Sequence, residues 1–142
     1  MGQSYFAEGM HERPATFSLF TRHLPLGWGY LISAGLESAL DYLERFRFLE
    51  DDLAYLEETG LFTGGFLDHL RRVRFRGDVR GLPEGTLFFS DEPVLEVTGP
   101  ILEAQLIETT VLNEIHFQSL VATKAARCVD AAQGRKLVDF SL

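Results

Sequence analysis

The chain has 142 residues, of which 46% are hydrophobic, and this is enough for about one domain with a packed core. Its formal net charge of −8 argues against a surface that binds nucleic acid or an anionic membrane, because phosphate backbones require clustered Lys and Arg. A local arginine pocket for a phosphorylated small molecule remains compatible with this charge.

One cysteine, Cys128, is present, so an internal disulfide is excluded, and we interpret this residue as a small core residue rather than a reactive nucleophile. No apolar run approaches the ~20 residues of a membrane span. The first residues lack the basic and apolar regions of a signal peptide. Together these features favour a cytoplasmic location.

The first 34 residues predict a short helix and two strands. Residues 1–10 are typical of the end of a helix, and a strand is expected from Pro14 to Arg22. A second strand is expected over residues 30–34. Because proline and glycine separate the two strands, they are expected to pair as a hairpin.

Residues 36–75 predict three helices. The first has apolar residues at three- and four-residue spacing, the second follows Glu50 and ends at Gly60, and the third runs from Phe66 to Val73. A basic cluster near the end of the third helix is interpreted as complementing the helix dipole rather than binding a ligand. Its members are Arg71, Arg72 and Arg74.

Strands return over residues 78–98, separated by turn-forming segments, and Gly99-Pro100 ends the last of them. A long helix is expected over residues 101–133, with small residues in its second half that would let other elements approach its axis. Residues 136–140 predict a buried strand. A helix followed by a strand indicates the beginning of a β/α layer that the chain does not complete.

The sequence shows no metal-ligand spacing, nucleophile triad or phosphate-binding glycine loop, so no catalytic residue and no metal ligand is predicted. The four histidines are scattered and are interpreted as structural: His11, His23, His69 and His116.

Two residues are candidates for ligand binding. Arg22 closes a predicted strand before a turn, where a guanidinium could reach a phosphate, although an ordinary surface arginine is the simpler interpretation. Phe140 ends a predicted strand, where an aromatic ring could stack on a flat ligand, although core packing is the simpler interpretation.

Several segments resemble the nicotinate phosphoribosyltransferase family, in the family's order and over nearly the whole chain. The part from Gly77 to Arg127 is the most specific. The segments are QSYFAEGM (3–10), RPATFSLF (13–20), GYLISAGLESALDY (29–42), FRGDVRGLPEG (75–85), EPVLEVTGPILEAQ (92–105), ETTVLN (108–113), ATKAAR (122–127) and VDF (138–140).

The resemblance implies an α+β fold with a mostly antiparallel sheet and flanking helices. Residues 1–100 would form the amino-terminal domain, and residues 101–142 would form a connecting long helix and the first strand of an incomplete α/β barrel. It also implies a reaction in which nicotinate and phosphoribosyl pyrophosphate form nicotinate mononucleotide, with ATP hydrolysis and Mg²⁺, in the salvage synthesis of NAD.

The resemblance also implies roles for the two candidate residues. Phe140 matches the aromatic residue that stacks on the pyridine ring. Arg22 matches a basic residue that reaches ligand phosphates across a dimer interface, so a homo-oligomer or a partner chain supplying the barrel is expected.

Other family features are missing from the sequence. An Asp-Leu-Tyr segment would precede Met1, and an arginine pair, the phosphorylated histidine and the ribose and phosphate loops would follow Leu142. We therefore expect the chain alone to be inactive, to bind neither ATP nor Mg²⁺ tightly, and to self-associate. The alternatives are a non-catalytic ligand-binding or oligomerisation module and a decaying gene product. The choice between nicotinate and nicotinamide remains open.

Overall fold

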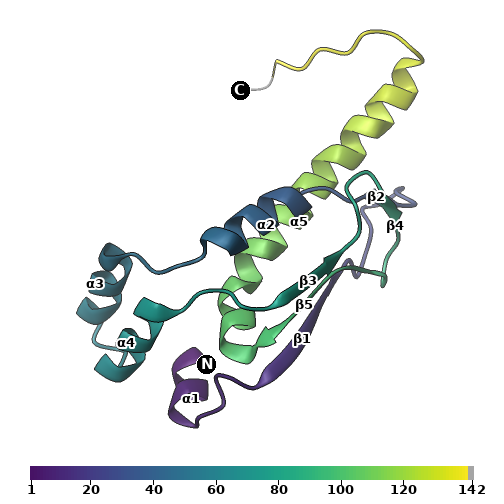
Figure 1. The fold of residues 1–142 in the computed structure, drawn as a ribbon. Helices are drawn as coiled ribbons and strands as arrows, with labels where there is room; N and C mark the ends of the chain where they lie inside the picture. Colours follow the sequence, from purple (N-terminus) through teal and green to yellow (C-terminus); the bar gives the residue numbers. More distant parts are fainter. Residues whose placement is uncertain (141–142) are drawn as a thin grey trace.

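A three-stranded sheet and one long helix form the frame of the protein, which the computed structural model describes for residues 1–140 (Figure 1). The elements in chain order are α1 (Gly2–Ala7), β1 (Pro14–Phe20), β2 (Leu31–Ile32), α2 (Leu36–Arg45), α3 (Glu50–Glu58), α4 (Gly64–Arg72), β3 (Asp78–Gly81), β4 (Leu87–Phe88), β5 (Pro93–Pro100) and α5 (Ile101–Ala132). The mixed helical and antiparallel composition confirms the predicted α+β class.

The main sheet has the strand order β1-β5-β3, and β2 pairs separately with β4; every pair is antiparallel. The predicted hairpin between residues 14–22 and 30–34 is therefore wrong. The eight-residue β5 matches the length of β1, with Phe17 opposite Val97, whereas β2 has only two residues. A strand of that length cannot satisfy the backbone groups of β1.

The long helix α5 contacts β1, β2, β5 and α2. A stripe of residues four apart is buried along it: Glu103, Ile107, Val111, Ile115, Ser119 and Thr123. At the end of this stripe, small side chains let the β2 segment approach closely, as predicted. Thr123 Oγ1 accepts a 2.8 Å hydrogen bond from the N–H of Ile32, and Ser119 Oγ accepts a 3.2 Å bond from the N–H of Ala34.

The three predicted helices of residues 36–75 are confirmed as α2, α3 and α4. α2 begins after Gly35, and its first N–H groups are satisfied by Glu84, whose Oε1 accepts bonds from Gly35 and Glu37 at 2.9 and 3.2 Å. α3 and α4 pack on each other beside the sheet (Figure 1). Their buried residues extend the core: Leu53, Phe66, Leu67 and Leu70.

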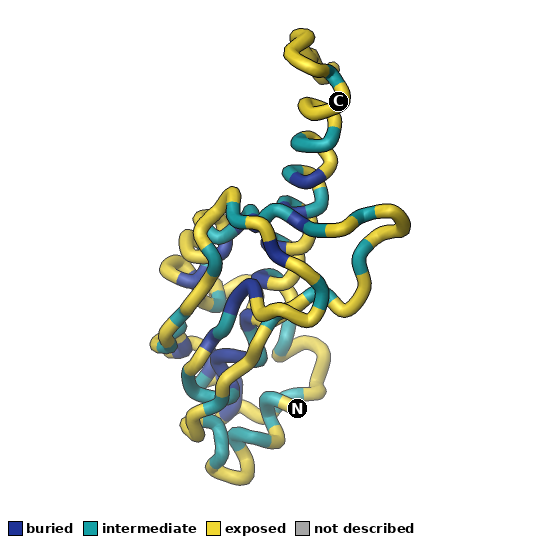
Figure 2. The backbone as a smooth tube through the Cα atoms, turned by 90° about the vertical axis from the view of Figure 1, so that its right-hand side faces the viewer, coloured by how far each residue is buried: buried dark blue, intermediate teal, exposed yellow. Residues whose placement is uncertain are grey.

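The last part of α5 extends beyond the packed elements, and its surface is largely exposed (Figure 2). Within the described chain, no residue after Thr123 is buried. Cys128 is exposed, so its predicted place in the core is wrong. The reason is its position on the projecting turns of α5, where no sheet or helix covers it.

The segment after α5 also differs from expectation. Residues 136–140 form no strand and are exposed, which corrects the predicted buried strand. A strand needs a neighbour to pair with its backbone groups, and no strand of residues 1–140 lies in register with this segment. Residues 141–142, the last of the predicted second domain, lie outside the described residues.

No helix formed by residues 1–140 combines the length and apolar character needed to cross a membrane.

Candidate functional site

An apolar groove runs between the β1–β5 face and α5, with Arg22 at its rim. One cavity of about 390 Å³ is walled by β1 and β5 on one side and by α5 on the other. A second cavity of about 350 Å³ shares Arg22 with the first and continues toward His23 and His116. Apolar walls with a few polar groups are typical of small-molecule sites.

The backbone around Arg22 is held in place while its side chain is left exposed. β1 ends in a register shift after Leu19, and the carbonyl of Thr21 then accepts a 2.9 Å hydrogen bond from the N–H of Asp91. The guanidinium makes no hydrogen bond or ion pair with any described residue. It can therefore bind a phosphate or carboxylate group without breaking an existing contact.

Phe140 lies apart from this groove. Its residue is 86% exposed, and it belongs to the segment that extends past the end of α5 (Figure 1). The two cavities at Arg22 include no residue of that segment. Within residues 1–140 of a single chain, the structure therefore does not bring Arg22 and Phe140 together.

A polar cluster that the sequence did not indicate lies where α4 meets the segment between α1 and β1. The rings of His11 and His69 are 4.8 Å apart between centroids, and Phe6 packs against both. Burial lowers the pKa of His69 below its ordinary value of 6.5, and the neighbouring His11 lowers it further. The position of His69 beside the apolar stripe of α4 indicates partial burial. The sequence does not indicate its contact with His11, because the two residues are far apart along the chain.

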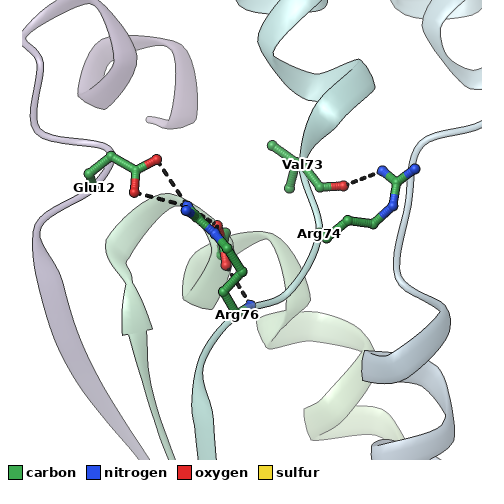
Figure 3. Close-up of polar contacts among 5 residues, drawn as sticks. Glu12, Val73, Arg74 and Arg76 are labelled. Carbon is green, nitrogen blue, oxygen red and sulfur yellow. Dashed lines mark hydrogen bonds and ion pairs between the residues drawn. The ribbon is translucent and has the colours of Figure 1, made fainter.

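Glu12 and Arg76 join this cluster to the start of α5. Arg76 Nη2 donates to both oxygens of Glu12 at 2.9 and 3.0 Å, and also to Glu103 Oε1 at 2.6 Å (Figure 3). Glu103 is 3% exposed and accepts two further bonds from Arg76, from Nε and from the backbone N–H, each at 2.8 Å. These bonds raise the pKa of Arg76 above its ordinary value and keep the buried carboxylate paired.

The predicted basic cluster at the end of α4 is partly neutralised. Arg71 pairs with Glu50 and Asp68. Arg74 turns away from the Glu12 pair and donates a 2.6 Å bond to the carbonyl of Val73 (Figure 3). Arg71 and Arg74 already contact protein groups, so they are less available to a ligand. The interpretation that the cluster complements the dipole of α4 therefore suits it better than a ligand site.

Mg²⁺ does not fit the groups that the described residues bring together. Among residues 1–140, only His11, Glu12 and His69 form a cluster that could hold a metal ion. Mg²⁺ prefers oxygen ligands in octahedral geometry, whereas two of these three ligands are imidazoles.

The family is decided by the comparison of the whole sequence with known proteins. Residues 1–116 match the family model described as the nicotinate phosphoribosyltransferase (NAPRTase) N-terminal domain. The chain belongs to the nicotinate phosphoribosyltransferase family. The match covers every strand, the helices α1 to α4 and the first half of α5.

Individual relatives of the nicotinate phosphoribosyltransferase family agree with this assignment. The chain is 52% identical over 140 residues to nicotinate phosphoribosyltransferase pncB2 of Mycobacterium tuberculosis, covering 99% of this chain and 30% of that protein. It is 46% identical over 127 residues to the Bacillus subtilis nicotinate phosphoribosyltransferase, covering 89% of this chain and 26% of that protein.

A solved structure supports the fold as well as the family. The crystal structure of human nicotinic acid phosphoribosyltransferase superposes with a TM-score of 0.88 at 37% identity, covering 96% of this chain and 28% of the human chain. The chain thus spans less than a third of the length of these relatives.

Proposed function

We propose that this chain acts as the amino-terminal domain of an enzyme that joins nicotinate to phosphoribosyl pyrophosphate, with ATP hydrolysis, in the cytoplasmic salvage synthesis of NAD. The match of residues 1–116 to the amino-terminal domain of the family carries this proposal. The relatives to which the chain is similar are nicotinate phosphoribosyltransferases, and their activity supplies the reaction proposed here. The same match favours this function over a non-catalytic binding module.

In this proposal residues 1–100 form the amino-terminal domain, and residues 101–142 lead into the barrel, which a further part of the protein, a partner chain or another copy would supply. Phosphoribosyl transfer passes through an oxocarbenium-like transition state, so the enzyme must position the ring and stabilise the departing diphosphate. Arg22, with a free guanidinium beside an apolar groove, suits the phosphate-binding role.

Phe140 would take the ring-stacking role once its segment pairs with barrel strands. Its exposure in the described chain is compatible with this role, because an aromatic side chain that lacks intramolecular cover is available to a ligand or partner. Magnesium and ATP would rely on groups beyond the described residues.

A chimera tests the proposal. This chain would replace the matching segment of the Bacillus subtilis relative, and formation of nicotinate mononucleotide would be measured. We expect an active chimera in which Arg22→Ala raises the KM for phosphoribosyl pyrophosphate roughly ten- to hundredfold, the usual effect of losing a hydrogen bond to a charged group. Phe140→Ala should instead raise the KM for nicotinate.

Arg47→Ala is the matched control, because Arg47 is exposed and makes no hydrogen bond or ion pair with a described residue. It should leave both KM values unchanged. A folded chimera without activity would contradict the proposed domain function. An active chimera in which Arg22→Ala behaves like Arg47→Ala would remove Arg22 from the site.

A further inference from the structure

The cluster of His11, Glu12 and His69 has the composition of a transition-metal site. We propose that these three side chains bind one divalent ion of the zinc class and thereby tie the segment before β1 to α4. Their potential ligand atoms all lie within 4.8 Å of one another. Tetrahedral zinc with bonds of about 2.0–2.1 Å needs ligand atoms roughly 3.4 Å apart, so small side-chain rotations would close the site.

One ring nitrogen in the cluster lacks a partner. His11 Nδ1 is buried and makes no hydrogen bond within the described chain. Buried polar atoms nearly always have a partner, so an imidazole nitrogen that no protein group uses, beside a second imidazole, is available to a metal ion. Phe6 contacts both rings, at centroid distances of 5.1 Å to His11 and 4.9 Å to His69, and so limits their movement.

The carboxylate of Glu12 can serve as the third ligand without losing Arg76. It accepts from Arg76 Nη2 alone, and a carboxylate offers about four acceptor positions. Arg76 would then act as the outer partner that orients a metal-bound carboxylate. The contact also links the site to Glu103, whose negative charge offsets part of the positive potential of Arg76.

The surroundings select the class of ion. The guanidinium groups of Arg72 and Arg76 lie near His69 and oppose any cation, so charge attraction alone would not hold one there. Coordination by two imidazoles favours zinc, cobalt or nickel over the oxygen-preferring magnesium and calcium. A cavity of about 290 Å³ that Glu12 and His69 also line has room for a water as the fourth ligand.

The experiment uses the complete 142-residue chain, freed of metal with a chelator that is then removed. Titration with Co²⁺ is followed by visible absorption, which reports coordination geometry, and Zn²⁺ is added last. We expect one Co²⁺ per chain, displacement by Zn²⁺, and a higher Tm with Zn²⁺ than without it. His11→Gln and His69→Gln should each weaken binding by at least about tenfold, since even outer-shell changes have that effect.

His116→Gln is the matched control, because His116 is an exposed histidine of α5 outside the cluster. It should bind Co²⁺ as the unchanged chain does. Equal loss in all three variants, or unchanged binding in His69→Gln, would show adventitious surface binding and overturn the proposal. Absence of Co²⁺ binding by the unchanged chain would also overturn it.

A measurement on the unchanged chain tests the site without relying on variants that could misfold. Zn²⁺ should shift the imidazole nitrogen resonances of His11 and His69 and leave those of His23 in place. Shifts at His23 but not at the cluster would overturn the proposal. Because this test needs no phosphoribosyl transfer, its result is independent of the proposed enzyme function.

Discussion

At the scale of single residues, the chemistry that fixes the amino-terminal end of α5 is a buried carboxylate. Glu103 lies in the first turn of α5, where a negative charge is also favoured by the helix dipole. Arg76 donates hydrogen bonds to this carboxylate, and its side chain is 57% exposed. Only the charge of Glu103, and not that of Arg76, is therefore removed from water. This asymmetry makes the carboxylate more sensitive to substitution than the guanidinium.

Glu103→Gln should therefore destabilise the chain by about 2–3 kcal/mol, because the amide keeps the shape but loses the charge that accepts three bonds from Arg76. Urea unfolding followed by circular dichroism measures this difference. Glu44→Gln, at an exposed position that makes no hydrogen bond, should change the stability by less than about 0.5 kcal/mol. Equal effects of the two changes would contradict the structural role of Glu103.

Gly35 is required for both its backbone conformation and its lack of a side chain. Its φ is +92°, and an added Cβ would lie 2.5 Å from the carbonyl oxygen of Glu114. Gly35→Ala should cost about 2–4 kcal/mol, combining left-handed strain with a backbone clash. Gly65→Ala tests the same substitution in open space inside α4 and should stabilise by about 0.5–1 kcal/mol. Thermal unfolding should therefore show a lower Tm for Gly35→Ala and a higher Tm for Gly65→Ala.

At the scale of elements, two hydroxyls of α5 hold the β2 segment, and that of Thr123 is the one that bonds β2 itself. Thr123 is fully buried, accepts from the N–H of Ile32 and donates a 2.6 Å bond to the carbonyl of Ser119. Thr123→Val keeps the volume but leaves the Ile32 N–H without an acceptor, which should cost about 1–3 kcal/mol. Thr109→Val, on the exposed side of the same helix, is the control and should be near neutral.

Amide hydrogen exchange would locate the effect. In Thr123→Val the Ile32 amide should lose protection while the amides of β5 keep theirs. Uniform loss of protection would show general destabilisation instead of a local junction.

The elements also show what the sequence alone could predict. α2, α4 and α5 follow from apolar residues at helical spacing, because that signal is local. The pairing of β1 with β5 was missed because strand partners are chosen by non-local length and register, which no short window of sequence contains.

In the candidate site, too, local features could be predicted from the sequence and non-local contacts could not. Arg22 could be flagged because a strand end before a turn is a local feature, and the structure places it at a groove. The neighbouring His11 and His69 could not be paired, because only the packing of α4 beside the segment before β1 joins them. Residues 136–140 form no strand, because their residue types favour a strand without supplying the neighbouring strand that would cover it.

At the scale of the whole molecule, the exposed side of α5 presents a surface suited to association. Phe117 and Val121 are one helical turn apart and are 69% and 52% exposed. Adjacent apolar side chains on a surface favour contact with another protein surface, so self-association of the 142-residue chain remains the prediction.

Sedimentation velocity between about 1 and 100 µM tests this prediction, because the apparent mass of an associating chain rises with concentration. The double substitution Phe117→Ser and Val121→Ser should lower the association, since it removes the apolar pair without touching the buried stripe of α5. Tyr55→Ser is the control: Tyr55 is 68% exposed but lies on α3, away from α5, and its loss should leave the association unchanged.

A clean monomer over the whole range would contradict self-association. If the α3 and α5 variants reduced it equally, association would be non-specific, and α5 would not be the contact surface.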